Sequence, residues 1–310
     1  MLVSIHQLMQ DTVKRKYAVG YFESWNMESM MAVLDAAEET GSPIIIGFNG
    51  DFVLNPDRLD KQDIRILAAM AKKAAELASV PVGLLLNETG DYTALERCLD
   101  LGFTGVMPRS PGEEDERYTS DVAAFTAKAH AKGIWVEGEL GVLPTSMDGT
   151  TGTVDEGSLT DPQEAADFVR KTGIDALAIS VGNVHHLVGE TQGVDLALVR
   201  RIHEATKTPL VVHGGTGLDK EQLAELVDAG MAKLNVGSCF KEAFMDGMRE
   251  ALGRDRVKEQ LDPHMLLGTG GRFDVMTTGR LRMKETCKTF IDKIGCRGKA
   301  ESFDKEALRP

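Results

Sequence analysis

Two histidines of the sequence have the placement needed to bind one divalent metal ion. His185 follows the sixth short apolar run of the chain and His213 stands at the end of the seventh, and each imidazole can supply a ligand nitrogen. A usable site normally has at least three protein ligands, and we expect Glu88, which follows the third run, to be the third. The alternative is that these histidines donate hydrogen bonds and bind nothing, and spacing alone favours neither interpretation.

Two glycine-rich turns predict an anion-binding site. The segment HGGTG covers residues 213–217, and the segment NVGS covers residues 235–238. Glycine allows backbone N–H groups to approach an anion closely, and the N-terminus of a following helix adds a favourable dipole. Many glycines only make turns, but two such turns after consecutive runs favour a phosphate site.

Short apolar runs alternate along the chain with segments of helical periodicity, such as KQDIRILAAMAKKAAELAS. The eight runs are Tyr17–Glu23, Pro43–Asn49, Pro81–Asn87, Gly105–Arg109, Ile134–Gly141, Ala176–Gly182, Pro209–Gly214 and Lys233–Ser238. Strands this apolar are covered on both faces, as in a parallel sheet wrapped by helices. Eight such units in sequence predict a closed (β/α)8 TIM barrel, and an open doubly wound sheet is the alternative.

Helix-boundary residues agree with this architecture. In the segment TDPQEAADFV, Asp161 fits an N-cap, Pro162 the first helical turn and Glu164 the reciprocal capping position. Glycines at the expected helix ends, each followed by an apolar residue and a strand, are Gly102, Gly133, Gly173 and Gly230.

We expect a single domain over residues 1–310, with the barrel at about 1–253 and a C-terminal helical extension at about 254–310. The extension is either a packing appendage or a subunit contact, and the sequence leaves both open. The segment 142–159, rich in Gly, Thr and Ser, has a length typical of a lid or binding loop.

Composition excludes several classes of protein. The net charge of −13 argues against nucleic acid as a partner, and no apolar stretch is long enough to predict a membrane span. The N-terminus lacks the apolar core of a signal peptide and is predicted to form an amphipathic helix. The four cysteines form no CxxC pair, so we expect reduced thiols in a cytoplasmic protein.

In a (β/α)8 barrel the carboxyl ends of the strands meet on one face, where such barrels carry their chemistry. The polar residues expected on that face are Glu23, Asn49, Asn87, Glu88, Arg109, Glu139, His185, His186, His213 and Asn235. The predicted metal ligands and the predicted anion site would therefore share one mouth.

Several phrases of the sequence resemble one known family. They are LVVHGGTGL, AKLNVGS, DALAISVGNVHH, VEGELG, KRKYAVGYF and ASVPVGLLL. The chain is similar to the class II ketose-bisphosphate aldolases, which include the fructose- and tagatose-bisphosphate aldolases. The matching segments occur in the same order along the chain, from about Leu2 to about Phe240. The resemblance implies a zinc-dependent (β/α)8 barrel that forms a homodimer or homotetramer.

The resemblance also implies roles for individual residues. The family's two later zinc histidines match His185 and His213, and its glutamate after the fifth strand matches Glu139. The residues that match its phosphate-binding backbone are Gly182, Gly214, Gly215, Thr216, Asn235, Gly237 and Ser238.

The chain departs from the family pattern at six positions. Where the family has Asp-His as proton donor and first zinc ligand, this chain has Asn87-Glu88. Arg109 replaces an acidic residue, Met147 replaces the glutamate that deprotonates the ketose, and Glu23 replaces an asparagine. The lysine expected shortly after the first histidine is missing as well.

These departures change the expected chemistry. Asn87 can donate a hydrogen bond but cannot exchange a proton, and loss of an acid or base typically costs on the order of 10²–10⁴ in rate. Substitutes for the missing groups could be Glu23, Asp148 or Glu156. A carboxylate ligand at position 88 weakens the ion as a Lewis acid and admits Mn²⁺ or Mg²⁺ beside Zn²⁺. Arg109 either orients that carboxylate, grips an anionic group of the substrate, or is simply exposed.

The sequence thus predicts a metal-dependent aldehyde-lyase acting on a phosphorylated ketose, or on dihydroxyacetone phosphate, through a metal-stabilised enediolate. The predicted catalytic residues are Asn87, Glu139, Arg109 and Glu23. Two alternatives stay open: an isomerase or epimerase that stops at the enediolate, and a catalytically silent homologue that binds a sugar phosphate.

Overall fold

The computed structural model describes residues 1–109, 116–141, 159–184, 193–254 and 259–303. Its centre is a closed barrel in which every strand is parallel to its neighbours and the first strand pairs with the last. The strands are β1 (Val19–Glu23), β2 (Ile44–Asn49), β3 (Val82–Thr89), β4 (Gly105–Pro108), β5 (Trp135–Leu140), β6 (Ala176–Ile179), β7 (Leu210–Val212) and β8 (Met231–Val236). The predicted (β/α)8 barrel is confirmed, and the open sheet is excluded.

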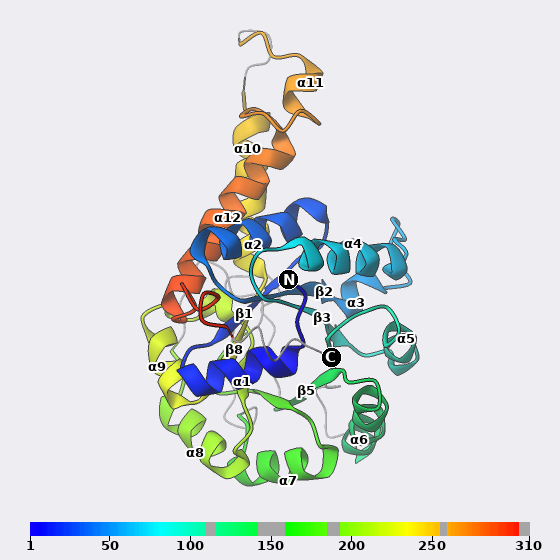
Figure 1. Ribbon diagram of the computed structural model, residues 1–310, viewed down its shortest axis with the longest axis vertical. Helices are drawn as coiled ribbons and strands as arrows, with labels where there is room; N and C mark the ends of the chain where they lie inside the picture. Colours follow the sequence, from blue (N-terminus) through cyan, green and yellow to red (C-terminus); the bar gives the residue numbers. More distant parts are fainter. Residues whose placement is uncertain (110–115, 142–158, 185–192, 255–258, 304–310) are drawn as a thin grey trace.

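Helices surround the barrel between consecutive strands (Figure 1). Those that follow β1 to β8 are α2 (Met27–Thr40), α3 (Gly50–Val53) with α4 (Ile64–Leu77), α5 (Tyr92–Cys98), α6 (Glu116–His130), α7 (Pro162–Thr172), α8 (Leu196–Thr206), α9 (Gln222–Ala229) and α10 (Ser238–Leu252). The predicted cap is present, because the Asp161 side chain accepts hydrogen bonds from the backbone N–H groups of Gln163 and Glu164 at the start of α7.

Two apolar cores hold the barrel. The larger lies between the strands and the surrounding helices, and the smaller fills the interior with side chains such as Tyr21, Leu85 and Trp135. Helix α1 (Ile5–Arg15) closes the N-terminal mouth, where its buried residues Ile5 and Leu8 join this interior core. The opposite mouth is left for polar side chains.

Helices α11 (Pro263–Leu266) and α12 (Val275–Lys293) follow the last barrel helix. Figure 1 shows α10 and α12 side by side, with their far ends projecting beyond the barrel and α11 near the tip. Helix α12 also packs along α2, where Arg280 forms hydrogen bonds to both carboxylate oxygens of Asp35 at 2.7 and 2.8 Å. No helix in the described part of the chain has the length and apolar character that a membrane crossing requires.

The close packing of α10 on α12 depends on a glycine. A Cβ at Gly247 would lie 2.3 Å from the carbonyl oxygen of Thr278. We therefore expect Gly247→Ala to destabilise the protein by about 1–3 kcal/mol, because overpacking forces the helices apart. In thermal unfolding this lowers the midpoint by several degrees, whereas Gly271→Ala, with only a side-chain atom at 3.6 Å, leaves it unchanged. Equal midpoints for both variants would contradict this prediction.

Candidate active site

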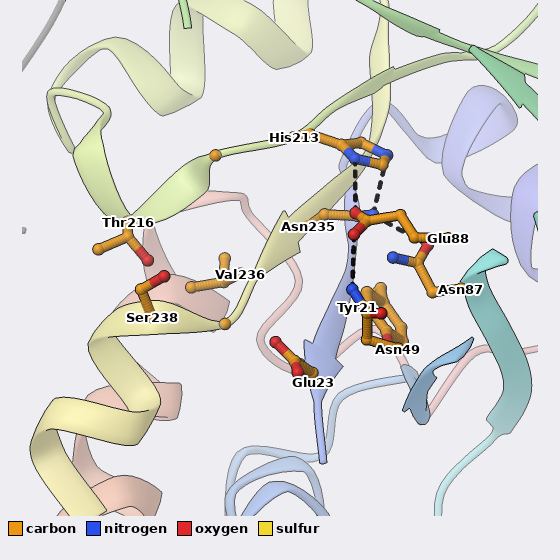
Figure 2. A pocket seen from close by; sticks show the side chains of 12 residues that line it. Tyr21, Glu23, Asn49, Asn87, Glu88, His213, Thr216, Asn235, Val236 and Ser238 are labelled. Atoms are coloured by element: carbon orange, nitrogen blue, oxygen red, sulfur yellow. Dashed lines mark hydrogen bonds and ion pairs between the residues drawn. The ribbon is translucent and has the colours of Figure 1, made fainter. Parts of the chain in front are cut away.

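The C-terminal mouth of the barrel holds a small polar pocket of about 40 Å³, shown in Figure 2. Its lining residues come from the ends of β1, β2, β3, β7 and β8 and from the turns that follow the last two. They are Tyr21, Glu23, Asn49, Asn87, Glu88, His213, Gly214, Thr216, Asn235, Val236, Gly237 and Ser238. Residues predicted from both the metal set and the anion site therefore line one cavity.

His213 lies fully buried at the end of β7, between two carboxylates. Its Nδ1 is 3.1 Å from Oε1 of Glu88, and its Nε2 is 2.8 Å from Oε1 of Glu137. The second oxygen of Glu88 accepts a hydrogen bond from Nδ2 of Asn49 at 2.6 Å. Burial alone would lower the pKa of His213, but the hydrogen bonds to Glu137 and Glu88 outweigh it and raise this pKa to about 9.

The backbone of Glu88 is in the left-handed region, with a φ of 48°. The register between β3 and β4 shifts at the same place, between Leu86 and Thr89. Consecutive strand residues normally point to opposite faces, yet Asn87 and Glu88 both line the pocket. The irregular backbone therefore brings two adjacent side chains into the site, at a cost of about 1–3 kcal/mol that is typical of functional positions.

Two charged residues inside the barrel were not predicted. Glu137 of β5 and Lys233 of β8 are fully buried and form an ion pair, in which Nζ of Lys233 is 2.8 Å from Oε2 of Glu137. Lys233 also donates to Oδ1 of Asn235, whose Nδ2 is 3.3 Å from Oδ1 of Asn87. Burial would raise the pKa of Glu137, but Lys233 and His213 outweigh it and lower this pKa below its ordinary value. A signal was present in the sequence, because each charge stands in a strand made mostly of apolar residues.

Glu139, the carboxylate predicted for the fifth strand, lies two residues further along the same face of β5 as Glu137. It is buried, and its carbonyl oxygen accepts a hydrogen bond from the Tyr118 hydroxyl at 3.0 Å. Glu139 is not one of the described residues that line the pocket. The carboxylate of β5 that contacts His213 belongs to Glu137.

Arg109, directly after β4, pairs with Asp51 at the start of α3. The second oxygen of that carboxylate accepts a hydrogen bond from the backbone N–H of Gly90 at 2.8 Å. The contacts described for Glu88 are with His213 and Asn49, so an orienting role of Arg109 on Glu88 stays a prediction.

Glu23, at the end of β1, faces the turn after β8 (Figure 2). Its Oε1 is 2.8 Å from Nζ of Lys241 in α10, and a Cβ at Gly237 would lie only 2.3 Å from its Oε2. Glycine at position 237 thus leaves the space that the carboxylate occupies. Burial raises the pKa of Glu23, and the ion pair with Lys241 opposes this shift.

The predicted anion site is only partly assembled around the pocket. Gly214, Thr216, Asn235, Gly237 and Ser238 line it, at the N-terminus of α10. Thr216 also accepts a hydrogen bond from the backbone N–H of Cys239 at 3.1 Å through its Oγ1. Of the described residues, Gly182 and Gly215 are not part of the lining.

A divalent metal ion fits the donor atoms of this pocket. Two ligands of one tetrahedral zinc lie about 3.4 Å apart, close to the 3.1 Å between Glu88 Oε1 and His213 Nδ1. A carboxylate on the other imidazole nitrogen, here Glu137, is the usual support of a metal-binding histidine. Within the described ranges no group of three such ligands is found, and the predicted ligand His185 lies outside them. Outside them too are His186, Met147, Asp148 and Glu156.

Comparison with known proteins identifies the class. Residues 3–299 match the family model of class II fructose-bisphosphate aldolase. The fructose-bisphosphate aldolase of Geobacillus stearothermophilus is 34% identical over 282 residues, covering 87% of this chain and 91% of the relative. That of Staphylococcus aureus is 31% identical over 305 residues, covering 97% and 99%. The chain therefore belongs to the class II fructose-bisphosphate aldolase family.

Solved structures agree with this assignment. The crystal structure of the YdjI aldolase from Escherichia coli K12 superimposes with a TM-score of 0.77 at 27% identity, covering 97% of this chain and 100% of that one. The structure of a putative fructose-1,6-bisphosphate aldolase from Coccidioides immitis gives a TM-score of 0.78 at 28% identity, covering 95% of this chain and 96% of that one. Both the predicted family and the predicted barrel are confirmed, and family membership supports a lyase of the aldolase type.

Proposed function

We propose that this protein is a metal-dependent aldehyde-lyase that acts on a phosphorylated ketose through an enediolate, with a specificity that differs from that of its relatives. The observation that carries the proposal is the pair Glu88–His213, held at 3.1 Å beside the turns after β7 and β8. The proposed metal ligands are Glu88, His213 and His185. The ion is zinc, and the carboxylate ligand also admits Mn²⁺ or Mg²⁺.

The groups at the C-terminal end of the barrel have separate proposed roles. A bound divalent ion would polarise the ketone oxygen of the substrate as a Lewis acid. Backbone N–H groups at Gly214 and Gly237, with the Ser238 hydroxyl, would hold the phosphate at the N-terminus of α10. Asn87 would donate a hydrogen bond to a substrate oxygen without moving a proton.

Proton transfer falls to another group, and Glu23 is our candidate. Its carboxylate lines the pocket, and burial raises its pKa, which makes a carboxylate a better proton acceptor near neutral pH. Lys241, at 2.8 Å, would keep it oriented. Glu139 and Arg109 remain proposed contributors from β5 and from the end of β4.

We also propose a homodimer or homotetramer in the cytoplasm. The family resemblance supports the assembly. All four cysteines are free, and Cys98, Cys287 and Cys296 are buried, as suits a reducing compartment.

Solvent exchange into dihydroxyacetone phosphate tests the proposed reaction. In deuterium oxide, the zinc-loaded protein is expected to exchange one hydroxymethyl hydrogen, followed by proton NMR, and to form a ketose phosphate when an aldehyde is added. Fructose bisphosphate, the substrate named for the relatives, serves as the comparison compound. Exchange without condensation would identify an isomerase or epimerase instead. Phosphate binding without exchange would overturn the catalytic proposal in favour of a silent homologue.

A further inference from the structure

The ion pair between Lys233 and Glu137 lies inside the barrel, beneath the pocket. Both side chains are fully buried, and the ammonium of Lys233 lies 5.1 Å from the ring centre of Tyr21. Removing two charges from water is costly, and apolar residues of similar volume are often at least as stabilising in such places. Stability alone therefore gives little reason for this pair, and its other contacts show what it does.

Glu137 determines which nitrogen of His213 faces the pocket. One carboxylate oxygen is 2.8 Å from Lys233, and the other is 2.8 Å from Nε2 of His213. A carboxylate beside an ammonium only accepts hydrogen bonds, so the 2.8 Å contact with Glu137 requires the hydrogen of the imidazole to be on Nε2. Nδ1 is thereby directed at Glu88, 3.1 Å away.

Lys233 determines the orientation of Asn235 in the same way. An ammonium only donates, and it contacts Oδ1 of Asn235. The amide nitrogen must then point the other way, where it lies 2.9 Å from Nε2 of His213 and 3.3 Å from Oδ1 of Asn87. With Nε2–H donating to Glu137, the amide nitrogen donates to Asn87 and only packs against the imidazole. Figure 2 shows His213, Asn235 and Glu88 converging at this point.

We propose that the Lys233–Glu137 ion pair is the positioning element of the site, fixing both the imidazole of His213 and the amide of Asn235. These are positioning residues, since neither of them lines the pocket. The consequence for metal binding rests on the proposed function. The orientation of the two side chains does not depend on it.

Two double variants separate positioning from stability. Glu137→Leu alone would leave a buried ammonium without its carboxylate counterion, and we expect that chain to fold poorly. Glu137→Leu with Lys233→Met removes both charges and the acceptor for His213. Glu137→Gln with Lys233→Met also removes both charges, but the amide oxygen can still accept from Nε2. Both doubles are expected to fold, as judged by circular dichroism.

Zinc affinity, measured by competition with a chromophoric chelator, is the first readout. We expect the Leu/Met double variant to bind zinc about 10–100-fold more weakly than the wild type, as for other lost partners of a metal-binding histidine. The Gln/Met variant should recover most of that loss. Unchanged affinity in the Leu/Met variant, or equal losses in both, would overturn the proposal.

The second readout uses the metal-free protein, so that it stands apart from the proposed reaction. With ¹⁵N-labelled histidine, and His213→Gln to assign the signal, the wild type should show His213 hydrogen-bonded through Nε2–H. The Gln/Met variant should keep this signal and the Leu/Met variant should lose it. If the wild type binds no zinc but the signals differ as expected, the metal proposal fails and the positioning role stands. Identical His213 signals in all three proteins would refute that role.

Discussion

Replacing His213 by alanine is expected to remove the bound divalent ion and with it the exchange reaction. The wild type should retain about one ion per chain after purification. Loss of a partner behind a metal-binding histidine typically costs 10–100-fold in affinity, so loss of the histidine itself should cost more than about 100-fold. Metal analysis of the purified variant measures this directly.

The same substitution leaves two carboxylates, Glu88 and Glu137, without their imidazole partner at 3.1 and 2.8 Å. Glu137 is fully buried but keeps Lys233 as its ion-pair partner, so we also expect a loss of stability of about 1–3 kcal/mol, the cost of a buried acceptor that has lost one donor. His213→Gln serves as a second variant, because its amide can still donate to Glu137, and it should lose the metal while keeping more of the stability. His264→Gln, an exposed histidine in α11, is the matched control and should keep its ion. A wild-type level of metal in His213→Ala would exclude the proposed site.

The barrel was predictable because buried parallel strands are apolar on both faces and their helices carry ordinary caps. The run Pro43–Asn49 differs from β2, Ile44–Asn49, by one residue. The run Pro209–Gly214 is longer than β7, Leu210–Val212, because it also includes Pro209 before the strand and His213 and Gly214 after it. The strand end that the sequence predicts least precisely is thus the point from which the residues of the site follow.

The depth of a side chain in the barrel was not predictable in the same way. Trp135, Glu137 and Glu139 share one face of β5, since strand residues alternate. The likeness to the family singled out Glu139, but contact with His213 depends on how far along the strand the histidine lies, and this is a property of register between strands. Glu88 shows the same limit, because alternation would turn it away from Asn87, and only its positive φ brings both into the pocket.

The second large effect is expected from restoring the family residues at positions 87 and 88. Asn87→Asp has the same shape, and its Oδ1 can keep the contact with Nδ2 of Asn235. It adds a group that can exchange a proton, which is worth on the order of 10²–10⁴ in rate. Glu88→His returns an imidazole ligand, and histidine is among the residues that tolerate the left-handed backbone found at this position. We expect the double variant to gain about 10²-fold or more in kcat/KM for cleavage of a ketose bisphosphate, measured by a coupled assay.

A substitution of Arg109 belongs to the same experiment, and its contact with Asp51 determines which variants must be compared. Arg109 pairs with Asp51, so Arg109→Asp alone would place two carboxylates together and remove the cation between them. Arg109→Asp should therefore be added to the double variant both with and without Asp51→Asn, and the gain should be larger when Asp51 is neutral. Asn87→Ser with Glu88→His is the matched control, because serine cannot supply the acid. If the aspartate variants bind zinc yet cleave ketose bisphosphate no faster than this control, these departures are not what separates this chain from its relatives.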